Sequence, residues 1–412
     1  MRVHLFIEHY PNPYKPWIDT QLVQMIKAGH DVRIFAFGAY TSTLHDEVRQ
    51  YGLLDRTGYL PGTLRGLRRH GPRALTRLVS SPAQELRRVG RSIGAASGAK
   101  HSLLVAARAL CLPAEAPDVC YVHNLATAAL LTFLKRLYPT TRVCLYFHGG
   151  EVGGQPRVGG EAHVFAAMDA VITSTRFAAG QAAERGCPPD KIAVVPLGFS
   201  IPAYSVREGR SYRPDGRVRF VSVGRMSPEK GFRHALAAVA LLRERGRRDF
   251  TYTFVGSGVE HKALMAQATA LGLDDVVHFA GEKTRTDVAE ILQESDVFVL
   301  PSIATELWAE TQATVVQEAL LMGCLTVTTT AGGVPEANAP VMNERFSVRP
   351  ADSAALAGAM EAAMGTDAAE MEGLAKAGRA FAAGRFDIAP LMDTILEHAK
   401  SGLPPSHPAR YA

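Results

Sequence analysis

Short runs of β-branched and aromatic residues alternate with longer amphipathic stretches along most of the chain, and this alternation constrains the fold more than any other feature. Several of the runs are almost wholly apolar, which is typical of strands covered on both faces. Strands that alternate with crossover helices form a parallel sheet. Ligands of such sheets bind at the carboxyl ends of the strands. We therefore expect an α/β protein with two Rossmann-like, doubly wound domains that face a central cleft.

The runs fall into two series, which the segment 201–217 separates. That segment is polar, rich in Pro, Gly and Arg, and without periodicity, which indicates a linker. At roughly 150 residues per domain, a chain of 412 residues has room for two to three domains. We therefore predict one domain in residues 1–200 and a second in 218–383. The predicted strands are residues 3–8, 31–37, 119–123, 143–147, 170–174, 192–196, 218–224, 252–256, 276–281, 297–301 and 325–329.

Composition narrows the class of protein. Hydrophobic residues make up 47% of the chain and charged residues 21%, which are values of globular proteins rather than disordered ones. The five cysteines are an odd number and form no CxxC pair, which argues against a disulfide framework or a zinc ribbon. The apolar runs are shorter than a membrane span, and the start of the chain does not resemble a secretory signal. We therefore expect a cytoplasmic protein.

Positive charge is concentrated in residues 61–110, which contain ten Arg or Lys residues and the single acid Glu85. One interpretation is a solvated helical face. The other is a surface for anions such as lipid headgroups or a lipid-linked phosphate, with peripheral contact at the inner face of a membrane. Nucleic acid is not an expected partner, because aromatic residues do not interleave with the arginines and no nucleic-acid motif is present.

The segment 301–337 has the most informative pattern. A helix is predicted to begin near Thr314, with Thr314 and Gln317 as a capping box. The free N–H groups at the start of such a helix form an anion site. Glu310 precedes the helix and Glu318 lies about one turn inside it. These acids fit a ligand that carries both phosphate and hydroxyl groups, as a nucleotide sugar does; the alternatives are a solvated loop acid and a partner of the helix dipole.

A second pattern lies in residues 218–236, where a buried strand ends at Gly224 and Arg225. Ser227 is predicted to cap the following helix, with Lys230 in its first turn. A lysine in that turn opposes the helix dipole, and a bound anion would offset this cost. Arg225 and Lys230 would then neutralise a diphosphate leaving group. The alternative is a pair of ordinary surface cations.

Glycines follow the strand predicted at 143–147, in the sequence HGGEVGG (148–154). Glycine lets a backbone approach a ligand closely. His148 lies at the carboxyl end of this strand, where site residues gather, although a single histidine is also common as a structural residue. Other chemistries lack their motifs: there is no Walker P-loop, no early GxGxxG, no HExxH, no Cys/His metal spacing, no DxD pair and no GxSxG elbow. We therefore expect neither a metal nor a cofactor.

Together these motifs resemble the retaining glycosyltransferases of family 4, which have the two-domain GT-B fold. The similarity rests on GRMSPEKG (224–231), FVGSG (254–258), VHFAGE (277–282), SDVFVLPS (295–302), the pair Glu310 and Glu318, and GGVPE (332–336). The first half matches through KAGHDVRIFAFG (27–38), FHGGE (147–151), DAVITST (169–175) and DKIAVVPLG (190–198). The opening HYPNPYKPWIDTQL (9–22) is similar to the subgroup that builds exopolysaccharides of the colanic-acid and amylovoran type.

The resemblance implies an enzyme that moves a hexose from a nucleotide sugar to a glycan, a lipid-linked or a small-molecule acceptor, with retention of anomeric configuration and without a metal. Its catalytic residues would be His148, Arg225, Lys230 and Glu310. Glu318 would bind the ribose hydroxyls. Further donor-binding residues would be Gly224, Glu282, Lys283, Thr284, Gln312, Ala313, Thr314 and Val315, and the acceptor side would contain Tyr14, Gly149, Gly150 and Glu151.

The resemblance also implies that the end of the chain, about residues 384–412, returns to the first domain. The sequence departs from the family where Pro11–Tyr14 replace a glycine pair and where Ala313 and Ser200 replace a glycine and an acid. Two other functions stay open: a phosphorylase or epimerase with the same fold, and a non-catalytic subunit that binds sugar nucleotides. The intact set of cations and carboxylates favours the transferase.

Overall fold

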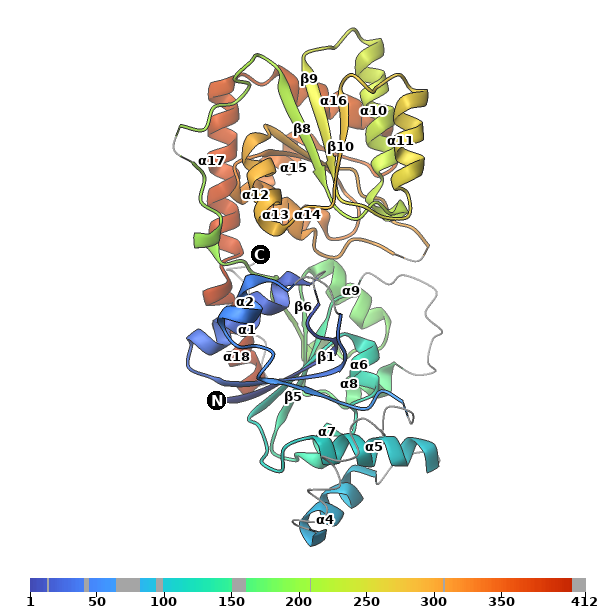
Figure 1. Ribbon diagram of the computed structural model, residues 1–412, viewed down its shortest axis with the longest axis vertical. Helices are drawn as coiled ribbons and strands as arrows, with labels where there is room; N and C mark the ends of the chain where they lie inside the picture. Colours follow the sequence, from blue (N-terminus) through green and yellow to red (C-terminus); the bar gives the residue numbers. More distant parts are fainter. Residues whose placement is uncertain are drawn as a thin grey trace.

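The computed structural model describes residues 1–12, 15–40, 44–63, 82–93, 99–149, 161–207, 209–306 and 308–401. Within them the chain forms two parallel β-sheets, which lie one above the other along the long axis of the molecule (Figure 1). The strands of the first sheet are β1 (Arg2–His9), β2 (Asp31–Gly38), β3 (Thr57–Tyr59), β4 (Val119–His123), β5 (Arg142–Phe147), β6 (Ala170–Thr173) and β7 (Ile192–Val194). Those of the second are β8 (Val218–Val223), β9 (Phe250–Val255), β10 (Val277–Gly281), β11 (Val297–Leu300), β12 (Leu325–Thr329) and β13 (Ser347–Val348).

Helices connect the strands and cover the sheets. The first half contains α1 (Pro16–Lys27), α2 (Asp46–Gln50), α4 (Pro82–Ile93), α5 (Ala99–Cys111), α6 (Leu125–Ala129), α7 (Leu134–Leu137), α8 (Ala162–Ala166), α9 (Arg176–Glu184) and the 3-10 turns η2 (Pro189–Lys191) and η3 (Ile201–Ala203). The second half contains η4 (Pro228–Lys230), α10 (Phe232–Glu244), α11 (His261–Ala270), α12 (Arg285–Glu294), α13 (Thr314–Leu321), α14 (Val334–Ala337), α15 (Pro340–Phe346), α16 (Ser353–Gly365), α17 (Ala368–Arg385) and α18 (Ile388–Ser401).

The predicted α/β class is confirmed, and each of the eleven predicted strands is present within two residues at either end. The strands β3 and β13 were not predicted. Both lie at sheet edges and have only three and two residues, so they are too short for a periodic pattern to form.

Each sheet reverses its strand order once. The first runs β3-β2-β1-β4-β5-β6-β7 and the second β10-β9-β8-β11-β12-β13. The reversal points therefore lie between β1 and β4 and between β8 and β11. Loops that leave such neighbouring strands in opposite directions open a crevice, which is where doubly wound sheets bind ligands.

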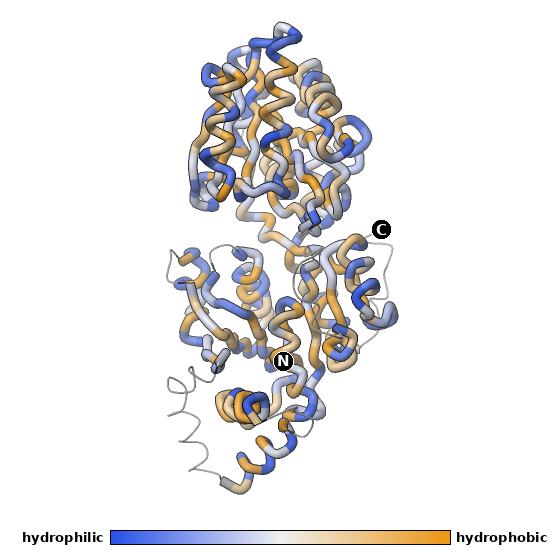
Figure 2. Tube along the Cα trace, turned by 90° about the vertical axis from the view of Figure 1, so that its right-hand side faces the viewer, coloured by the Kyte–Doolittle hydropathy of each residue, from blue (hydrophilic) through white to orange (hydrophobic). Residues whose placement is uncertain are grey.

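The hydrophobic residues of the strands are buried, and the helices around the sheets alternate between hydrophobic and hydrophilic residues along the chain (Figure 2). Two clusters of buried residues cover the two faces of the first sheet, and a third fills the second half of the chain. The last two helices belong to different clusters: α17 packs on α13, whereas α18 packs on α1 and β5. Leu391 and Ile395 of α18 lie in the core beside β1 and α1, so the chain returns to the first sheet after completing the second.

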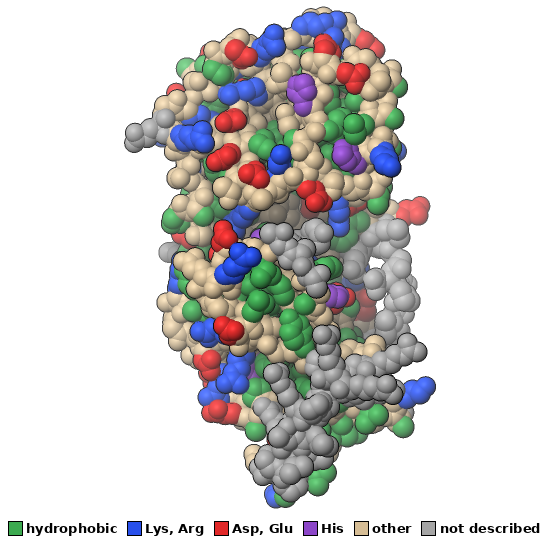
Figure 3. Space-filling model, viewed as in Figure 1, with side chains coloured by type: hydrophobic (Ala, Val, Ile, Leu, Met, Phe, Trp, Pro, Cys, Tyr) green, Lys and Arg blue, Asp and Glu red, His purple; other side chains and the backbone are tan. Residues whose placement is uncertain are grey.

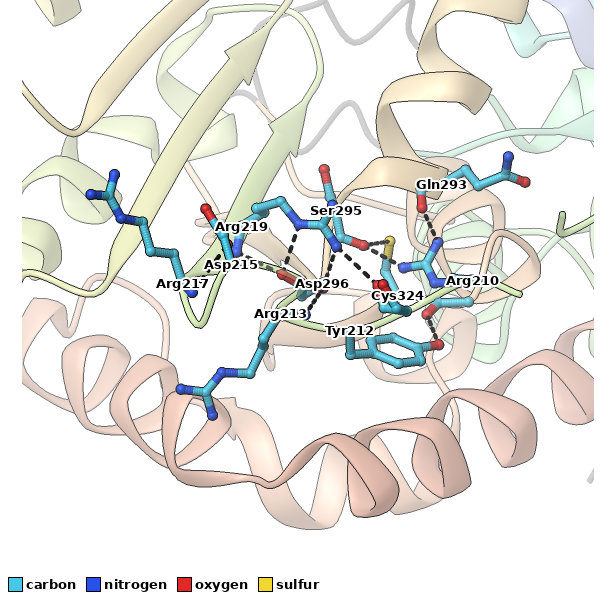
Figure 4. A network of polar contacts seen from close by, with 12 residues as sticks. Arg210, Tyr212, Arg213, Asp215, Arg217, Arg219, Gln293, Ser295, Asp296 and Cys324 are labelled. Carbon is cyan, nitrogen blue, oxygen red and sulfur yellow. Dashed lines mark hydrogen bonds and ion pairs between the residues drawn. The ribbon is translucent and has the colours of Figure 1, made fainter. Parts of the chain in front are cut away.

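The segment 201–217, whose composition indicated a linker, is attached firmly to the second half. Tyr212 Oη donates to the carbonyl of Gly323 at 2.8 Å, and Arg210 donates to carbonyls that include that of Met322 at 2.8 Å. The fully buried Asp296 accepts from the backbone N–H of Arg213 and from the Arg219 guanidinium at 2.7 Å (Figure 4). The segment 201–217 is therefore bound along the second half, where its arginine side chains donate hydrogen bonds to backbone carbonyls.

Among the described residues, no helix combines the length and the apolar character needed to cross a bilayer.

Candidate active site

The loop after β8 places Lys230 against the end of β11. Gly231 has a φ of +65°, and a Cβ at this position would lie 2.0 Å from the carbonyl oxygen of Pro301. Only glycine tolerates both conditions. Ser227 stands at the predicted N-cap position, with Pro228 and Lys230 in the turn that follows, but that turn is the short 3-10 element η4 and the Ser227 side chain makes no cap hydrogen bond. The long helix α10 begins only at Phe232. Gly231 breaks the helix, because its left-handed backbone cannot continue η4 into α10.

Lys230 and Glu310, eighty residues apart, form an ion pair. The Lys230 Nζ lies 2.5 Å from Glu310 Oε2, and the two side chains are 14% and 11% exposed. Glu310 is held from the other side, because its carbonyl accepts from the N–H of Gly333 at 2.8 Å. A Cβ at Gly332 or Gly333 would lie 2.2 or 1.9 Å from the carbonyl oxygens of Glu310 and Thr311. The glycines of the GGVPE motif therefore let one loop lie directly on the other.

The helix α13 begins at Thr314, as predicted, but the predicted capping box is absent. Ala313 is the residue at the N-cap, and the described part of the chain makes no side-chain cap hydrogen bond there. Thr314 is already the first helical residue, so its hydroxyl cannot serve as the cap, and Gln317 is buried instead of reaching back. The N–H of Thr314 donates to the carbonyl of Gln312 at 2.9 Å. The start of α13, beside Glu310, is therefore free of a side-chain cap.

Glu318 lies one turn inside α13 and accepts a hydrogen bond from Tyr204 Oη at 2.7 Å. Burial raises the pKa of Glu318, and the Tyr204 hydrogen bond and the Arg285 charge act against this rise. Arg285 donates to the same Tyr204 oxygen at 2.9 Å. Tyr204 and Arg285 were not singled out from the sequence. Tyr204 lies within the segment 201–217 that was interpreted as a linker, and no motif marks either residue.

Arg225 projects into solvent beside this loop. Its side chain is 67% exposed, and its guanidinium lies 3.2 Å from Glu229 Oε1. Gly224, which precedes it, packs closely on the FVGSG motif: a Cβ at Gly256 would lie 2.0 Å from the Gly224 carbonyl oxygen. That glycine motif thus supports the loop that presents Arg225.

The loop of residues 282–284, predicted to bind the donor, is exposed. Glu282 accepts a hydrogen bond from the hydroxyl of Ser257. Thr284 caps α12, because its hydroxyl accepts from the N–H of Asp287 and the Asp287 carboxylate accepts from the Thr284 N–H at 3.1 Å. The Thr284 side chain therefore caps α12, whereas the Lys283 side chain is exposed.

In the first half, His148 lies in a cluster of rings at the ends of β4 and β5. Its Nε2 is 3.2 Å from His123 Nδ1, its ring stacks on Tyr146 at 4.9 Å, and Trp17 lies 4.5 Å away. Burial lowers the pKa of His148, and His123 and Lys15 lower it further. Burial also lowers the pKa of His123 to about 3. Both imidazoles are therefore neutral near pH 7.

His123 was missed from the sequence, although the same reasoning that selected His148 applies to it. It is the last residue of the strand predicted at 119–123, which is adjacent to β5 in the sheet. Parallel strands end at the same edge, so the two histidines had to be neighbours. Trp17 has no such marker in the sequence.

The two halves meet beside these side chains. A Cβ at Gly149, whose φ is +63°, would lie 2.5 Å from Gln181 Oε1 and 2.8 Å from Thr311 Cγ2. His148 and Glu310 are the chain neighbours of Gly149 and Thr311, so the contact brings the predicted residues of both halves to one junction. The surface is hollowed between the two halves on the face that Figure 3 shows. Tyr14, Gly150 and Glu151, predicted on the acceptor side, lie outside the described residues.

Further bonds cross the same junction. The side-chain amide of Gln312 accepts from the N–H of Leu197 at 2.8 Å and donates to its carbonyl at 3.1 Å. Glu336 accepts from the backbone N–H groups of Arg176 and Phe177 at the start of α9, at 2.8 and 3.0 Å. Gln312, predicted to bind the donor, thus uses its side chain to join the halves, and its backbone stays beside Glu310. Ala313 and Val315 complete this short segment.

The basic segment 61–110 is less uniform than its sequence suggests. Arg108 is 1% exposed and donates to the carbonyls of Pro61 and Leu130 at 3.0 and 3.1 Å. Arg88 is buried as well and pairs with the only acid, Glu85, at 2.7 Å. Neither arginine adds charge to an anion-binding surface, because each is buried and its guanidinium donates to acceptors inside the protein instead of to water. Exposed cations of the described part are Arg87, Arg91 and Lys100; Arg65, Arg68, Arg69, Arg73 and Arg77 lie outside it.

Two family models match the chain. The model of group 1 glycosyl transferases matches residues 208–381, and the model of the glycosyl transferase 4-like domain matches residues 20–198. The amylovoran biosynthesis glycosyltransferase AmsK of Erwinia amylovora is 26% identical over 354 residues, which are 82% of this chain and 84% of AmsK. WcaL of Salmonella typhimurium, assigned to colanic acid biosynthesis as a glycosyltransferase, is 26% identical over 353 residues, with the same coverage.

Solved structures share the fold. HepE of Anabaena, crystallised in complex with UDP, superposes with a TM-score of 0.69 at 17% identity and covers 97% of this chain and 100% of its own. Sucrose-phosphate synthase of Thermosynechococcus elongatus reaches 0.66 at 16% identity and covers 96% and 98%. The chain therefore belongs to the glycosyltransferases of family 4, has their GT-B fold, and is similar to members that act in exopolysaccharide biosynthesis.

Proposed function

We propose that this glycosyltransferase moves a hexose from a nucleotide sugar to a glycan, lipid-linked or small-molecule acceptor, retaining the anomeric configuration and using no metal. The observation that carries the proposal is the convergence of Lys230, Glu310 and the start of α13 at one point. A cation, a carboxylate and backbone N–H groups at one point match the phosphates and hydroxyls of such a donor. Donors of this kind are also what HepE binds, as UDP-glucose, in one of its structures.

The donor diphosphate would bind between Lys230, Arg225 and the N–H groups of residues 312–315. Negative charge grows on the diphosphate as the bond to the sugar breaks, and fixed cations and helix N–H groups stabilise it without reorganising. Lys230 is already held by Glu310 at 2.5 Å, so its position is set before the donor arrives. These groups do the work that a divalent cation does elsewhere.

The two carboxylates would bind hydroxyl groups on either side of the diphosphate. Glu310 would accept hydrogen bonds from the transferred sugar, and Glu318 from the ribose. His148 would approach the sugar from the first half. Because its pKa is lowered by burial, it would act near pH 7 as a neutral hydrogen-bond partner and not as a charged acid.

Retention would follow from attack on the face that the diphosphate leaves. The oxygen of the acceptor forms the new bond to the anomeric carbon as the bond to the phosphate oxygen breaks, and the departing phosphate takes the acceptor's proton. The carboxylate of Glu310, paired with Lys230, binds hydroxyls and does not attack. Closure of the halves at Gly149 and Thr311 would exclude water and favour transfer over hydrolysis.

Residues 1–200 with about 384–412 would bind the acceptor, and residues 218–383 the donor. We propose a cytoplasmic location with peripheral contact at the inner membrane face. Arg87, Arg91 and Lys100 are exposed near Leu86 and Leu103, which are 62% and 52% exposed, a combination that suits an anionic lipid surface. Flotation with anionic vesicles at low salt tests this, and failure to bind retires it.

The stereochemistry tests the proposed reaction. Product made in the presence of EDTA is analysed by NMR for the anomeric proton coupling. We expect the same anomer as in the donor and undiminished turnover with EDTA. An inverted product contradicts retention, and loss of turnover on chelation contradicts metal independence. A sugar phosphate formed only when free phosphate is added would favour the phosphorylase, and a donor converted to its epimer without release of nucleotide would favour the epimerase.

A further inference from the structure

Three polar side chains, those of Glu47, Arg285 and Tyr204, connect the first half of the molecule to Glu318. Tyr204 is 2% exposed and follows η3, where the chain leaves the first half. Its hydroxyl lies 2.7 Å from Glu318 Oε1 and 2.9 and 3.2 Å from Nη2 and Nε of Arg285. Arg285, at the start of α12, reaches Glu47 on α2 at 3.5 Å. The series Glu47, Arg285, Tyr204, Glu318 thus spans both halves.

The chemistry of these groups fixes the direction of every bond. A guanidinium only donates, so the Tyr204 oxygen accepts two hydrogen bonds from Arg285 and must give its own proton to Glu318. The Tyr204 hydroxyl then donates its one proton and accepts with both lone pairs. Among the described residues, Oε2 of Glu318 has no such donor, so one oxygen of the carboxylate is fixed and the other is available to a ligand.

Tyr204 and Arg285 also favour the ionised form of Glu318. Burial raises the pKa of Glu318, which disfavours its ionised form, while Tyr204 and Arg285 favour that form. An ionised carboxylate is a pure acceptor, which is the form that binds two neighbouring hydroxyl groups. Burial also raises the pKa of Tyr204, so the phenol keeps the proton that it donates.

We propose that Tyr204 and Arg285 are positioning residues that orient the carboxylate of Glu318 toward a ribose, and that Glu47 couples this orientation to the placement of the two halves. The inference rests on the proposed function, in which Glu318 accepts the ribose hydroxyls. Tyr204, Arg285 and Glu47 act through Glu318. Separation of the halves removes Glu47 from Arg285, so the nucleoside is held most tightly when the halves are placed as observed.

A purely structural role for Tyr204 predicts different behaviour. Its ring packs edge-on against Phe199 at 5.6 Å, and Arg285 lies over it at 5.5 Å. Tyr204→Phe keeps the ring and its packing and removes only the hydroxyl. A structural role makes this variant affect every ligand alike, whereas the positioning role affects only ligands that carry ribose hydroxyls.

The test measures binding of UDP, GDP and ADP to the full chain by calorimetry, and then of the 2′,3′-dideoxy form of whichever nucleotide binds. We expect Tyr204→Phe to weaken the ribonucleotide about tenfold and its dideoxy form less than about twofold. Equal weakening of both forms, or none, overturns the inference and leaves the proposed function standing. A wild-type chain that binds no nucleotide overturns both.

The coupling has its own test. Glu47→Gln removes half of a partly exposed ion pair, with side chains 28% and 36% exposed, so we expect about two- to fourfold weaker ribonucleotide binding. Asp46→Asn is the matched control, since Asp46 is the neighbouring exposed acid on α2. The effect of Glu47→Gln must vanish in an Arg285→Gln background. Equal effects of the two α2 variants, or persistence without Arg285, refute the coupling.

Discussion

The ion pair between Lys230 and Glu310 makes a prediction in which stability and activity separate. Lys230→Met leaves Glu310 buried without its cation. Removing one partner of a buried pair costs about 3–5 kcal/mol, and the lower end applies here because the side chains are 14% and 11% exposed. For a domain of this size, about 3 kcal/mol corresponds to a melting temperature lower by roughly 6–12 °C.

The double variant Lys230→Met/Glu310→Leu replaces both charges by apolar groups, and such replacements are often neutral. We expect it to recover most of the lost stability in thermal unfolding followed by circular dichroism. Both variants lack the cation at the diphosphate, so we expect the rate of sugar transfer to fall about 10²- to 10³-fold in each. Lys262→Ala, which removes an exposed lysine of α11, is the control. A double variant that melts as low as the single one, or normal turnover by Lys230→Met, would contradict this prediction.

Three further predictions follow from other contacts. His4 is fully buried among aromatic rings, and burial lowers its pKa from 6.5 to about 3. The stability that neutral His4 contributes is therefore complete above pH 6.5 and is lost as the pH falls toward 3. His4→Phe should flatten the decline in urea unfolding midpoints measured over that pH range. Gly333→Ala should abolish transfer, because its Cβ would lie 1.9 Å from the Thr311 carbonyl; normal turnover would show that the loops can separate. Asp296→Ala should destabilise the second half by about 3–5 kcal/mol in chemical denaturation, since it removes the buried carboxylate that pairs with Arg219. A change under 1 kcal/mol would show that other contacts hold the segment 201–217.

The fold could be predicted because its information is local. Apolar strands and amphipathic helices leave a periodic trace in the sequence, and parallel topology follows from their alternation. Val119–His123 and Leu325–Thr329 were predicted to the residue. The capping box at Thr314 was wrong for a related reason: the residue pattern does not reveal the backbone conformation of Ala313, which sets where the helix begins.

The site could be predicted only in part, because its remaining contacts join distant segments. The motifs identified Lys230 and Glu310 separately, yet nothing in the sequence indicated that they form an ion pair. Tyr204 reaches Glu318 across 114 residues, and Glu47 reaches Arg285 across 238. Such pairs depend on how the two halves pack. The same holds for Arg88 and Arg108, which look like surface cations until the carbonyls around them are placed.

Nucleotide release from a donor shows most directly whether Lys230 binds the diphosphate. The wild-type chain, Lys230→Met and Lys262→Ala are incubated with UDP-, GDP-, ADP- and dTDP-sugars in EDTA without acceptor, and slow nucleotide release is followed. We expect release from one donor by the wild type and by Lys262→Ala, and loss of release in Lys230→Met. Release that does not depend on Lys230, or no release and no nucleotide binding across the panel, would contradict this expectation.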